Sequence, residues 1–498
     1  MDASPGYPRP NPSLSFWLQH TRNSPLLGHR TTDALPDKTD ATIIGSGLSG
    51  AATAYFLLTA GPEDKRPKSV ALLEAREACD GATARNGGHC RPDCYRGAAN
   101  SHPFRYKRAD WGRSADYTHY KANFGREQAL KVIQNEMDTL NLMEEIIAKE
   151  GIDCDFWRGF TYDVAMDQSA ADSLAASYAD FIADGGPVEG IVTPILDPAE
   201  AREATRCPAA TAAYKSPAGS LFPRKLVLHL LTLCVKKYGL NLQTRTPVRR
   251  VMPRTHNIGD TRESGARAGG WRVETDRGAV ETETVVYATN AYTATLLPEF
   301  AGHIWPFKGQ CAAAVPPEAY AGPNMLRETY GLAPSDYLIQ RPSDGVIIFG
   351  GQRKSVPVER LLGNTDDARV DPEMAAALRE ALPRYLEGWG ENSDLAVGEG
   401  LVHVWSGIMG YTTEGIPYVG ELHDKPGAFI CAGHHGHGMA RVMTCARGLA
   451  ALIQGSSWES TGLPECFQPT RERLARPKQV VTHDIGKQEV IGRAESEA

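Results

Sequence analysis

The chain has 498 residues, enough for two or more domains, and its 42% hydrophobic and 23% charged residues are typical of soluble globular proteins. A formal net charge of −7 argues against nucleic-acid binding and against attraction to an anionic membrane, and no uncharged apolar run is long enough to span one. The ten cysteines show no repeating spacing, so we expect free thiols in a reducing cytoplasm and no metal site.

Residues 1–38 are rich in Pro, Ser and Asn and carry one apolar cluster at Phe16, Trp17 and Leu18. This composition predicts an extended N-terminal extension that packs through Trp17, with a disordered leader as the alternative. A basic start followed by an apolar core is missing from Met1 to Ser15, so we expect no signal peptide.

Residues 40–50 combine a short apolar run, typical of a buried strand, with a glycine-rich turn. The glycines form the pattern G-x-G-x-x-G at Gly45, Gly47 and Gly50. Because the apolar stretch 51–58 predicts a helix, the context is strand, turn and helix, which favours a dinucleotide site over an ordinary glycine-rich turn. The helix N-terminus would receive the negative charge of a pyrophosphate.

The second half of this unit is the predicted strand 70–73, which runs directly into Glu74. An acid at this place accepts hydrogen bonds from ribose hydroxyls. The small residues of 75–88, with Gly87, Gly88 and a backbone-bonding Asn86, indicate a loop pressed against a flat ligand.

Further elements follow from hydrophobic periodicity and from Gly and Pro punctuation. The predicted helices cover 125–150, 170–183, 223–238, 372–386 and 440–453. The predicted strands fall within 155–166, 240–251, 271–275, 337–340, 346–350 and 429–432, with a strand pair at 279–288 and a polar loop at 254–270. The strand ending at Ala288 runs into a small-residue turn, which we expect near the cofactor.

Three histidines occur in the glycine-rich loop 433–439, which opens the last long helix. A helix start presents N–H groups and positive dipole charge, which suit the negative N1–O2 edge of a reduced flavin. A zinc cluster is the alternative, but no carboxylate or cysteine set accompanies the histidines, so we predict no metal.

These motifs together resemble the D-amino-acid oxidase superfamily of FAD-dependent amine oxidoreductases, which includes sarcosine oxidase, glycine oxidase and γ-glutamylputrescine oxidase. The N-terminal signature is G-S-G-L-S-G at 45–50, L-L-E-A at 72–75 and T-A-R-N-G-G-H at 83–89. The C-terminal signature is G-Y-T-T-E-G-I-P-Y-V-G at 410–420 and H-G-H-G-M at 435–439. The resemblance spans residues 40 to 460, with the motifs in the family's order.

The resemblance implies an α/β fold in which a Rossmann-like FAD-binding domain carries an inserted antiparallel α+β substrate domain. The FAD-binding domain would comprise residues 39–115, 205–304 and 399–470, and the substrate domain 116–204 and 305–398, between the extension 1–38 and a tail 471–498.

By matching motif positions, the resemblance implies a set of FAD-binding residues. They are Gly45, Ser46, Gly47, Leu48, Ser49, Gly50, Glu74, Ala75, Arg76, Thr83, Ala84, Arg85, Asn86, Gly87, Gly88, His89, Val248, Ala288, Thr289, Asn290, Gly407, His435, Gly436, His437, Gly438 and Met439. FAD is expected without a covalent link, because the cysteine that tethers flavin in monomeric sarcosine oxidase has no counterpart around 407–409. His89 is the main rival tether, and Cys90 and Cys311 are lesser ones.

The implied activity is oxidation of a C–N bond of an amine or amino acid by hydride transfer to flavin N5, with molecular oxygen reoxidising the flavin to give peroxide. Candidate substrate contacts are Arg91, Tyr337, Gln352, Arg353, Trp405 and His435, each with an ordinary structural role as the alternative. The lysines that serve oxygen and the substrate carboxylate in sarcosine oxidase are replaced near Ile348 and Met439, which argues against sarcosine as substrate. A dehydrogenase, a tailoring oxidase of a specialised metabolite and a FAD-binding protein without turnover are the rival readings.

Overall fold

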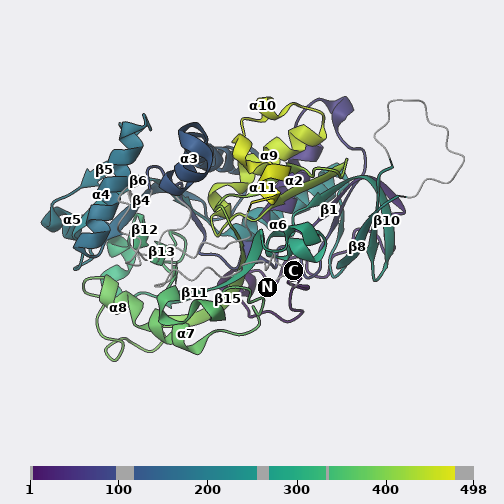
Figure 1. The fold of residues 1–498 in the computed structure, drawn as a ribbon. Helices are drawn as coiled ribbons and strands as arrows, with labels where there is room; N and C mark the ends of the chain where they lie inside the picture. The colour runs from purple at the N-terminus through teal and green to yellow at the C-terminus, as the bar shows by residue number, and fades with distance from the viewer. Residues whose placement is uncertain (1–3, 97–116, 255–268, 333–335, 477–498) are drawn as a thin grey trace, which may run out of the picture.

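The computed structural model describes residues 4–96, 117–254, 269–332 and 336–476. Its elements form two sheets, each with its own helices, placed side by side (Figure 1). Most of the predicted loop 254–270 and of the predicted tail 471–498 lies outside the described residues, as does 97–115 of the first predicted segment. No helix in the described part of the chain is long and apolar enough to cross a membrane.

The first sheet has a parallel centre in the order β16-β17-β10-β1-β2-β7, with β9 and β8 continuing from β10. Its strands are β1 (Lys38–Ile44), β2 (Val70–Leu73), β7 (Asn241–Gln243), β8 (Val248–Pro253), β9 (Trp271–Thr275), β10 (Gly278–Tyr287), β16 (Tyr418–Glu421) and β17 (Ala428–Ala432). All residues of β2 and β17 are buried, as expected for parallel strands covered on both faces.

Helices α2 (Leu48–Thr59), α6 (Pro223–Tyr238) and α9 (Val442–Ile453) lie together beside this sheet (Figure 1). α2 packs against both of the others, which explains why ten of its twelve residues are buried. α3 (Tyr117–Glu150) packs on α9 and kinks at Gly125, whose φ is 81°. The shared core of these helices and β1 and β2 fixes where the β1–α2 turn lies.

The second sheet is mainly antiparallel, in the order β15-β11-β14-β13-β12-β4-β6-β3, with β5 on β6. Its strands are β3 (His89–Cys90), β4 (Trp157–Ala165), β5 (Thr193–Ile195), β6 (Ala212–Ser220), β11 (Ile304–Val315), β12 (Thr329–Leu332), β13 (Asp336–Gln340), β14 (Ile347–Gly350) and β15 (Gly400–Thr412). β11 and β15 pair along their length, and both contact the 3-10 turn Asn290–Thr295 that follows β10 of the first sheet.

Several helices accompany the second sheet. They are α4 (Gln168–Ala183), α5 (Pro198–Thr205), α7 (Pro372–Arg379) and α8 (Ala381–Tyr385). The remaining short helices are α1 (Phe16–Gln19), α10 (Trp458–Thr461) and α11 (Arg471–Leu474). A second core of aromatic and aliphatic side chains lies between β4, β12–β14 and the helices α5, α7 and α8.

The predicted fold class is confirmed, but the sheets divide the chain differently from the predicted segments. β3, β6 and β15 lie in segments predicted for the FAD-binding domain, yet all three are strands of the second sheet. The physical reason is pairing: β6 bonds along its whole length to β4, and β15 to β11. These crossing strands bring residues of both sheets to one place.

Candidate active site

A cavity of about 610 Å³ lies where the two sheets meet. The first sheet contributes the carboxyl ends of β1 and β2, where parallel sheets commonly bind ligands. The second sheet contributes Gly309 to Cys311 of β11, Tyr337 of β13 and Gly407 to Tyr411 of β15. The volume of the cavity falls in the usual range for small-molecule and cofactor sites.

The turn between β1 and α2 requires its glycines for two different reasons. A Cβ on Gly45 would lie 2.6 Å from the Ala288 carbonyl oxygen, and one on Gly50 would lie 1.9 Å from the Gly45 carbonyl oxygen. Gly47 is different, because a Cβ there would meet only Thr83 Oγ1, at 3.4 Å, and the residue lines the cavity. Gly45 and Gly50 therefore shape the turn, whereas Gly47 leaves room for a ligand at the start of α2.

Glu74 follows β2 and lines the cavity beside this turn. Its carboxylate accepts hydrogen bonds from the N–H (2.9 Å) and Oγ (2.6 Å) of Ser46 and from the N–H of Arg76 (2.8 Å). These bonds fix the carboxylate at the end of the strand. Since a carboxylate offers about four acceptor sites, one remains for a ligand hydroxyl.

The loop 83–89 passes along the cavity, with Thr83, Arg85, Asn86, Gly87 and His89 in its lining. The carbonyl oxygens of three successive residues are held by side chains: Ala84 by Ser15 Oγ (2.5 Å), Arg85 by Trp405 Nε1 (2.8 Å) and Asn86 by Trp17 Nε1 (2.7 Å). In contrast, no described residue accepts a hydrogen bond from the N–H of Asn86 or of Gly87. Gly87 is buried, so its N–H needs an acceptor that a ligand can supply.

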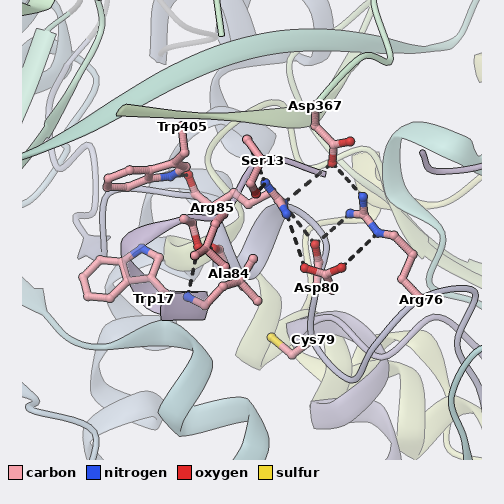
Figure 2. Close-up of polar contacts among 12 residues, drawn as sticks. Ser13, Trp17, Arg76, Cys79, Asp80, Ala84, Arg85, Asp367 and Trp405 are labelled. Atoms are coloured by element: carbon pink, nitrogen blue, oxygen red, sulfur yellow. Dashed lines mark hydrogen bonds and ion pairs between the residues drawn. The ribbon is translucent and has the colours of Figure 1, made fainter. Parts of the chain in front are cut away.

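The Arg85 side chain turns away from the cavity into a buried ion network (Figure 2). Its guanidinium donates to the carbonyl oxygens of Asp80 (3.0 Å), Ser13 (2.7 Å) and Ser406 (3.0 Å). Arg76 joins the network through Asp80 (3.4 Å) and Asp367 (2.9 Å). The two arginines therefore brace the loop from behind, while the Cβ, Cδ and carbonyl oxygen of Arg85 lie next to Gly407.

The three histidines of the loop 433–439 point to three different partners. His434 Nε2 lies 3.2 Å from Ser49 Oγ, His435 Nδ1 accepts from the Thr412 N–H (3.1 Å), and His437 Nε2 lies 3.1 Å from a Glu136 oxygen. The loop continues as a 3-10 turn, Gly438–Ala440, before α9 begins at Val442, two residues later than predicted. His435, His437 and the residues Gly436, Gly438 and Met439 all line the cavity.

The histidine rings differ in charge because their surroundings differ. Burial, with Arg441 and other cations nearby, lowers the pKa of His435 well below its ordinary value, so the ring is neutral and carries its proton on Nε2. Burial also lowers the pKa of His437, but the carboxylates of Glu136 and Asp93 outweigh it and raise that pKa overall. Arg441 pairs with Glu136 at 2.8 Å and completes this buried cluster.

Arg91 lies in the cavity wall with its charge already matched. Its guanidinium is 2.9 Å from Asp163 and 3.8 Å from Asp93, and Arg96 also approaches Asp163 at 3.2 Å. Tyr337 Oη lies 3.1 Å from Cys311 Sγ, and Arg353 donates to Tyr411 Oη at 2.7 Å. The part of the cavity that the second sheet lines is thus polar and hydrogen-bonded.

Most residues predicted from the sequence meet in this cavity. Those that line it are Gly45, Gly47, Leu48, Ser49, Glu74, Ala75, Arg76, Thr83, Arg85, Asn86, Gly87, His89, Arg91, Val248, Ala288, Thr289, Asn290, Tyr337, Arg353, Gly407, His435, Gly436, His437, Gly438 and Met439.

Six predicted residues lie behind the lining. Ser46, Gly50, Ala84 and Gly88 support the two loops from inside the protein. Trp405 is fully buried and holds the Arg85 carbonyl, and Gln352 bonds to Asp336 and Tyr385. Trp405 and Gln352 are therefore placed to support the site and do not face the cavity.

Sequence reasoning missed several lining residues. They include Gly6, Tyr7 and Pro8 of the N-terminal extension, and Asp163, Asp167, Asp336, Met409 and Tyr411. Tyr411 stands inside the recognised G-Y-T-T-E-G stretch, so the motif itself was a signal. Tyr7 carried no signal, because a proline-rich segment before the first strand resembles a disordered leader.

Comparison with known proteins gives a consistent result. The family model for FAD dependent oxidoreductases matches residues 40–452. The chain is 23% identical over 420 residues to a probable oxidoreductase, OrdL, of Haemophilus influenzae, covering 84% of this chain and 83% of that protein.

Solved structures share the fold. The glycine oxidase of Geobacillus kaustophilus superposes with a TM-score of 0.63 at 21% identity, covering 88% of this chain and 99% of that one. The L-proline dehydrogenase of P. horikoshii superposes with a TM-score of 0.61 at 19% identity, covering 88% and 98%.

Proposed function

The chain belongs to the family of FAD dependent oxidoreductases, as the sequence motifs indicated, and from this premise we propose that it oxidises a carbon–nitrogen bond of an amine or an amino acid. One observation carries the proposal. The cavity runs from the glycine turn of the first sheet to a polar compartment built by the second, with Arg91, Tyr337 and Arg353 in its wall. Two of the similar proteins, a glycine oxidase and an L-proline dehydrogenase, are named for amino acids, which supports this substrate class.

The residues present fit FAD along the whole cavity. Gly47 and the start of α2 would hold the pyrophosphate, Glu74 the ribose, and the N–H groups of Asn86 and Gly87 the ring system. Gly436 to Met439, at the start of α9, would face the ring's pyrimidine edge. When bound, FAD supplies the hydride acceptor at N5, which no side chain can replace.

The protein's own part is to select and position the substrate. A neutral amine can drive hydride loss from its neighbouring carbon with its lone pair, so no side chain need remove a proton from carbon. His435 is neutral, and its bond to Thr412 fixes the position of the ring. Arg91 is held in place by Asp163. Because both side chains are held in fixed positions in the cavity wall, both are suited to orient a substrate. Alignment of this kind can lower a barrier by about 7–11 kcal/mol when it is near ideal.

We also infer that FAD is held without a covalent bond. His89 Nε2 is engaged with Thr329 Oγ1 at 2.6 Å, and burial lowers the pKa of this ring. Cys90 Sγ donates to the Met439 carbonyl, and burial raises the pKa of Cys311 to about 11, so neither thiol is an available thiolate. Acid precipitation should release the yellow colour, and flavin that stays with the pellet would overturn this inference.

The experiment that tests the proposal is anaerobic mixing of the purified flavoprotein with a panel of amines, glycine, proline and other D- and L-amino acids. A substrate bleaches the flavin absorbance and yields an imine or carbonyl product, and kcat/KM rises with pH through the substrate amine's pKa. Adding air then distinguishes an oxidase, which releases peroxide, from a dehydrogenase. A hydroxylated product that requires NADPH would contradict the proposal and indicate a monooxygenase.

A further inference from the structure

The N-terminal extension is folded onto the site. Residues 4–37 precede β1, and the family model begins at residue 40, so this arm lies outside the part that the family model matches. Phe16 and Trp17 of the short helix α1 are buried in a cluster with Phe222, Ile339 and Trp405, which come from three distant parts of the chain. The arm is therefore a fixed part of the molecule.

The first set of contacts joins the arm to the loop beside the cavity. Ser15 holds the Ala84 carbonyl, Trp17 holds the Asn86 carbonyl, and the Ser13 carbonyl accepts from the Arg85 guanidinium between them. Ser15 and Trp17 are fully buried, so water does not replace these bonds. Figure 2 shows Ser13, Trp17 and Ala84 gathered around Arg85.

These bonds also orient the opposite side of the same peptides. In a planar trans peptide, the N–H of one residue points away from the carbonyl of the residue before it. Trp405 and Trp17 hold the carbonyls of Arg85 and Asn86, so the N–H groups of Asn86 and Gly87 point away from the two indoles. Those are the two N–H groups for which no described residue is an acceptor, and both residues line the cavity.

The second set of contacts lies at the other end of the cavity. Gly6, Tyr7 and Pro8 line it together with Glu74 and Val248. This part of the arm is anchored by Thr295 Oγ1, which donates to the Gly6 carbonyl (2.5 Å), and by Arg76, which donates to the Arg9 carbonyl (3.2 Å). The Tyr7 ring lies against the Arg249 guanidinium, with 4.5 Å between ring centre and carbon.

We propose that residues 4–18 are a built-in clamp for FAD. Tyr7 and its neighbours form the wall over the adenosine half, and Ser15 and Trp17 set the loop 84–87 so that the N–H groups of Asn86 and Gly87 donate to the bound flavin ring. The proposal concerns cofactor binding alone. It stands apart from the choice of substrate, so the two can fail separately.

Two arm variants test the flavin end. Ser15→Ala removes the donor to the Ala84 carbonyl and also the acceptor that caps α1 at the Leu18 N–H. Trp17→Phe removes the donor to the Asn86 carbonyl and keeps an aromatic ring in the cluster. The matched control is Ser24→Ala, in the same arm but outside the cavity lining. The measurements on the FAD-loaded protein are the rate of FAD release, followed by flavin fluorescence, and the flavin midpoint potential. No substrate is needed for either.

We expect each test variant to release FAD about tenfold faster, as loss of one buried hydrogen bond predicts. The midpoint potential should also move, because the donors to the ring are displaced, whereas Ser24→Ala should match the wild type in both readings. Wild-type release and potential in both folded test variants would overturn the clamp. Equal destabilisation of the apoprotein and the FAD-loaded protein, with an unchanged potential, would also overturn it and leave the arm a structural brace.

Tyr7→Ala tests the adenosine end and keeps the proposal falsifiable if the buried variants fail to fold. Tyr7 is 37% exposed, so its removal should leave the fold intact. FAD release should be faster than in the wild type, with no change in midpoint potential, because the ring system is remote from this end. An unchanged release rate would remove Tyr7 from the clamp.

Discussion

The side chain of Arg85 fixes the loop 83–89 in place, and the backbone of Arg85 lies beside the cavity. Its side chain is 1% exposed, and its guanidinium binds Asp80, Ser13 and Ser406, while its peptide lies beside the cavity. A buried charge of this kind is stable only when it is fully paired, which ties the loop to the protein on several sides. The motif arginine is therefore best understood as the residue that positions Asn86 and Gly87.

Gly47 and Gly50 differ in what replacing them should do. Gly50→Ala places a Cβ 1.9 Å from a carbonyl oxygen, so we expect the apoprotein to lose about 3 kcal/mol of unfolding free energy or more. Gly47 has a φ of −64°, which suits alanine, so Gly47→Ala should leave apoprotein stability within about 0.5 kcal/mol of wild type and weaken FAD binding. Denaturant unfolding and FAD titration measure the two effects. Full FAD affinity in Gly47→Ala would contradict the assignment of this turn to the pyrophosphate.

His435 should make stability depend on pH. Its pKa is lowered in the folded protein, chiefly by burial, so its contribution to stability is present above the unfolded-state pKa of about 6.5 and is lost as pH falls. Each pH unit below 6.5 should cost about 1.4 kcal/mol while the folded ring stays neutral. His435→Gln keeps an acceptor for the Thr412 N–H and removes the imidazole whose protonation makes stability depend on pH. Unfolding measured from pH 7.5 to 5.5 should therefore be less steep in the variant, and parallel curves would refute the prediction.

At the scale of elements, the sequence predicted best where local signals mark both ends. α6 was predicted over 223–238 and occupies Pro223–Tyr238, because Pro223 begins it and Gly239, with φ 71°, ends it. The predicted helix 372–386 is instead two helices that break at Glu380. Pro383 lacks the N–H that would bond to the preceding turn, so the helix cannot continue unbroken.

Contacts between distant segments could not be predicted in this way. The glycine turns, Glu74 and the loop 83–89 were found because their chemistry is local to short motifs. The packing of the arm through Trp17 was predicted and is confirmed, but its contact with the cavity was not predicted, since that contact depends on docking against Phe222 and Trp405, far along the chain. The strand pair expected at 279–288 is likewise one strand, β10, whose partners β1, β9 and β17 come from elsewhere.

The start of α4 offers a test of one element. Asp167 caps this helix, with its carboxylate accepting from the Ala170 N–H at 2.8 Å, and it also lines the cavity. Asp167→Ala should cost about 1 kcal/mol locally, so the amides of residues 168–172 should exchange faster in hydrogen-exchange mass spectrometry. Asp197→Ala removes the matching cap of α5 and should affect α5 alone. Unchanged exchange in α4 would show that the cap is dispensable.

At the scale of the whole molecule, the cavity lies between the two sheets and is lined by residues of both. FAD bound there would contact both, so it should stabilise both together. With FAD at a hundredfold excess over its Kd, we expect about 2.7 kcal/mol of added stability. Hydrogen exchange should slow in β1 and α2 of the first sheet and in β11 and β15 of the second. Protection confined to the first sheet would contradict this prediction.

The docked arm also constrains how the protein is made. Ser13 is bonded to Ser406, 393 positions later in the chain. At about 5–20 residues per second, a ribosome needs about 20–80 s to synthesise the intervening segment. During that time the apolar side chains of Phe16 and Trp17 have left the ribosome without the full cluster that buries them. The segment that is synthesised first can therefore reach its final place only after β15 exists, which makes arm docking a late step in the maturation of the nascent chain.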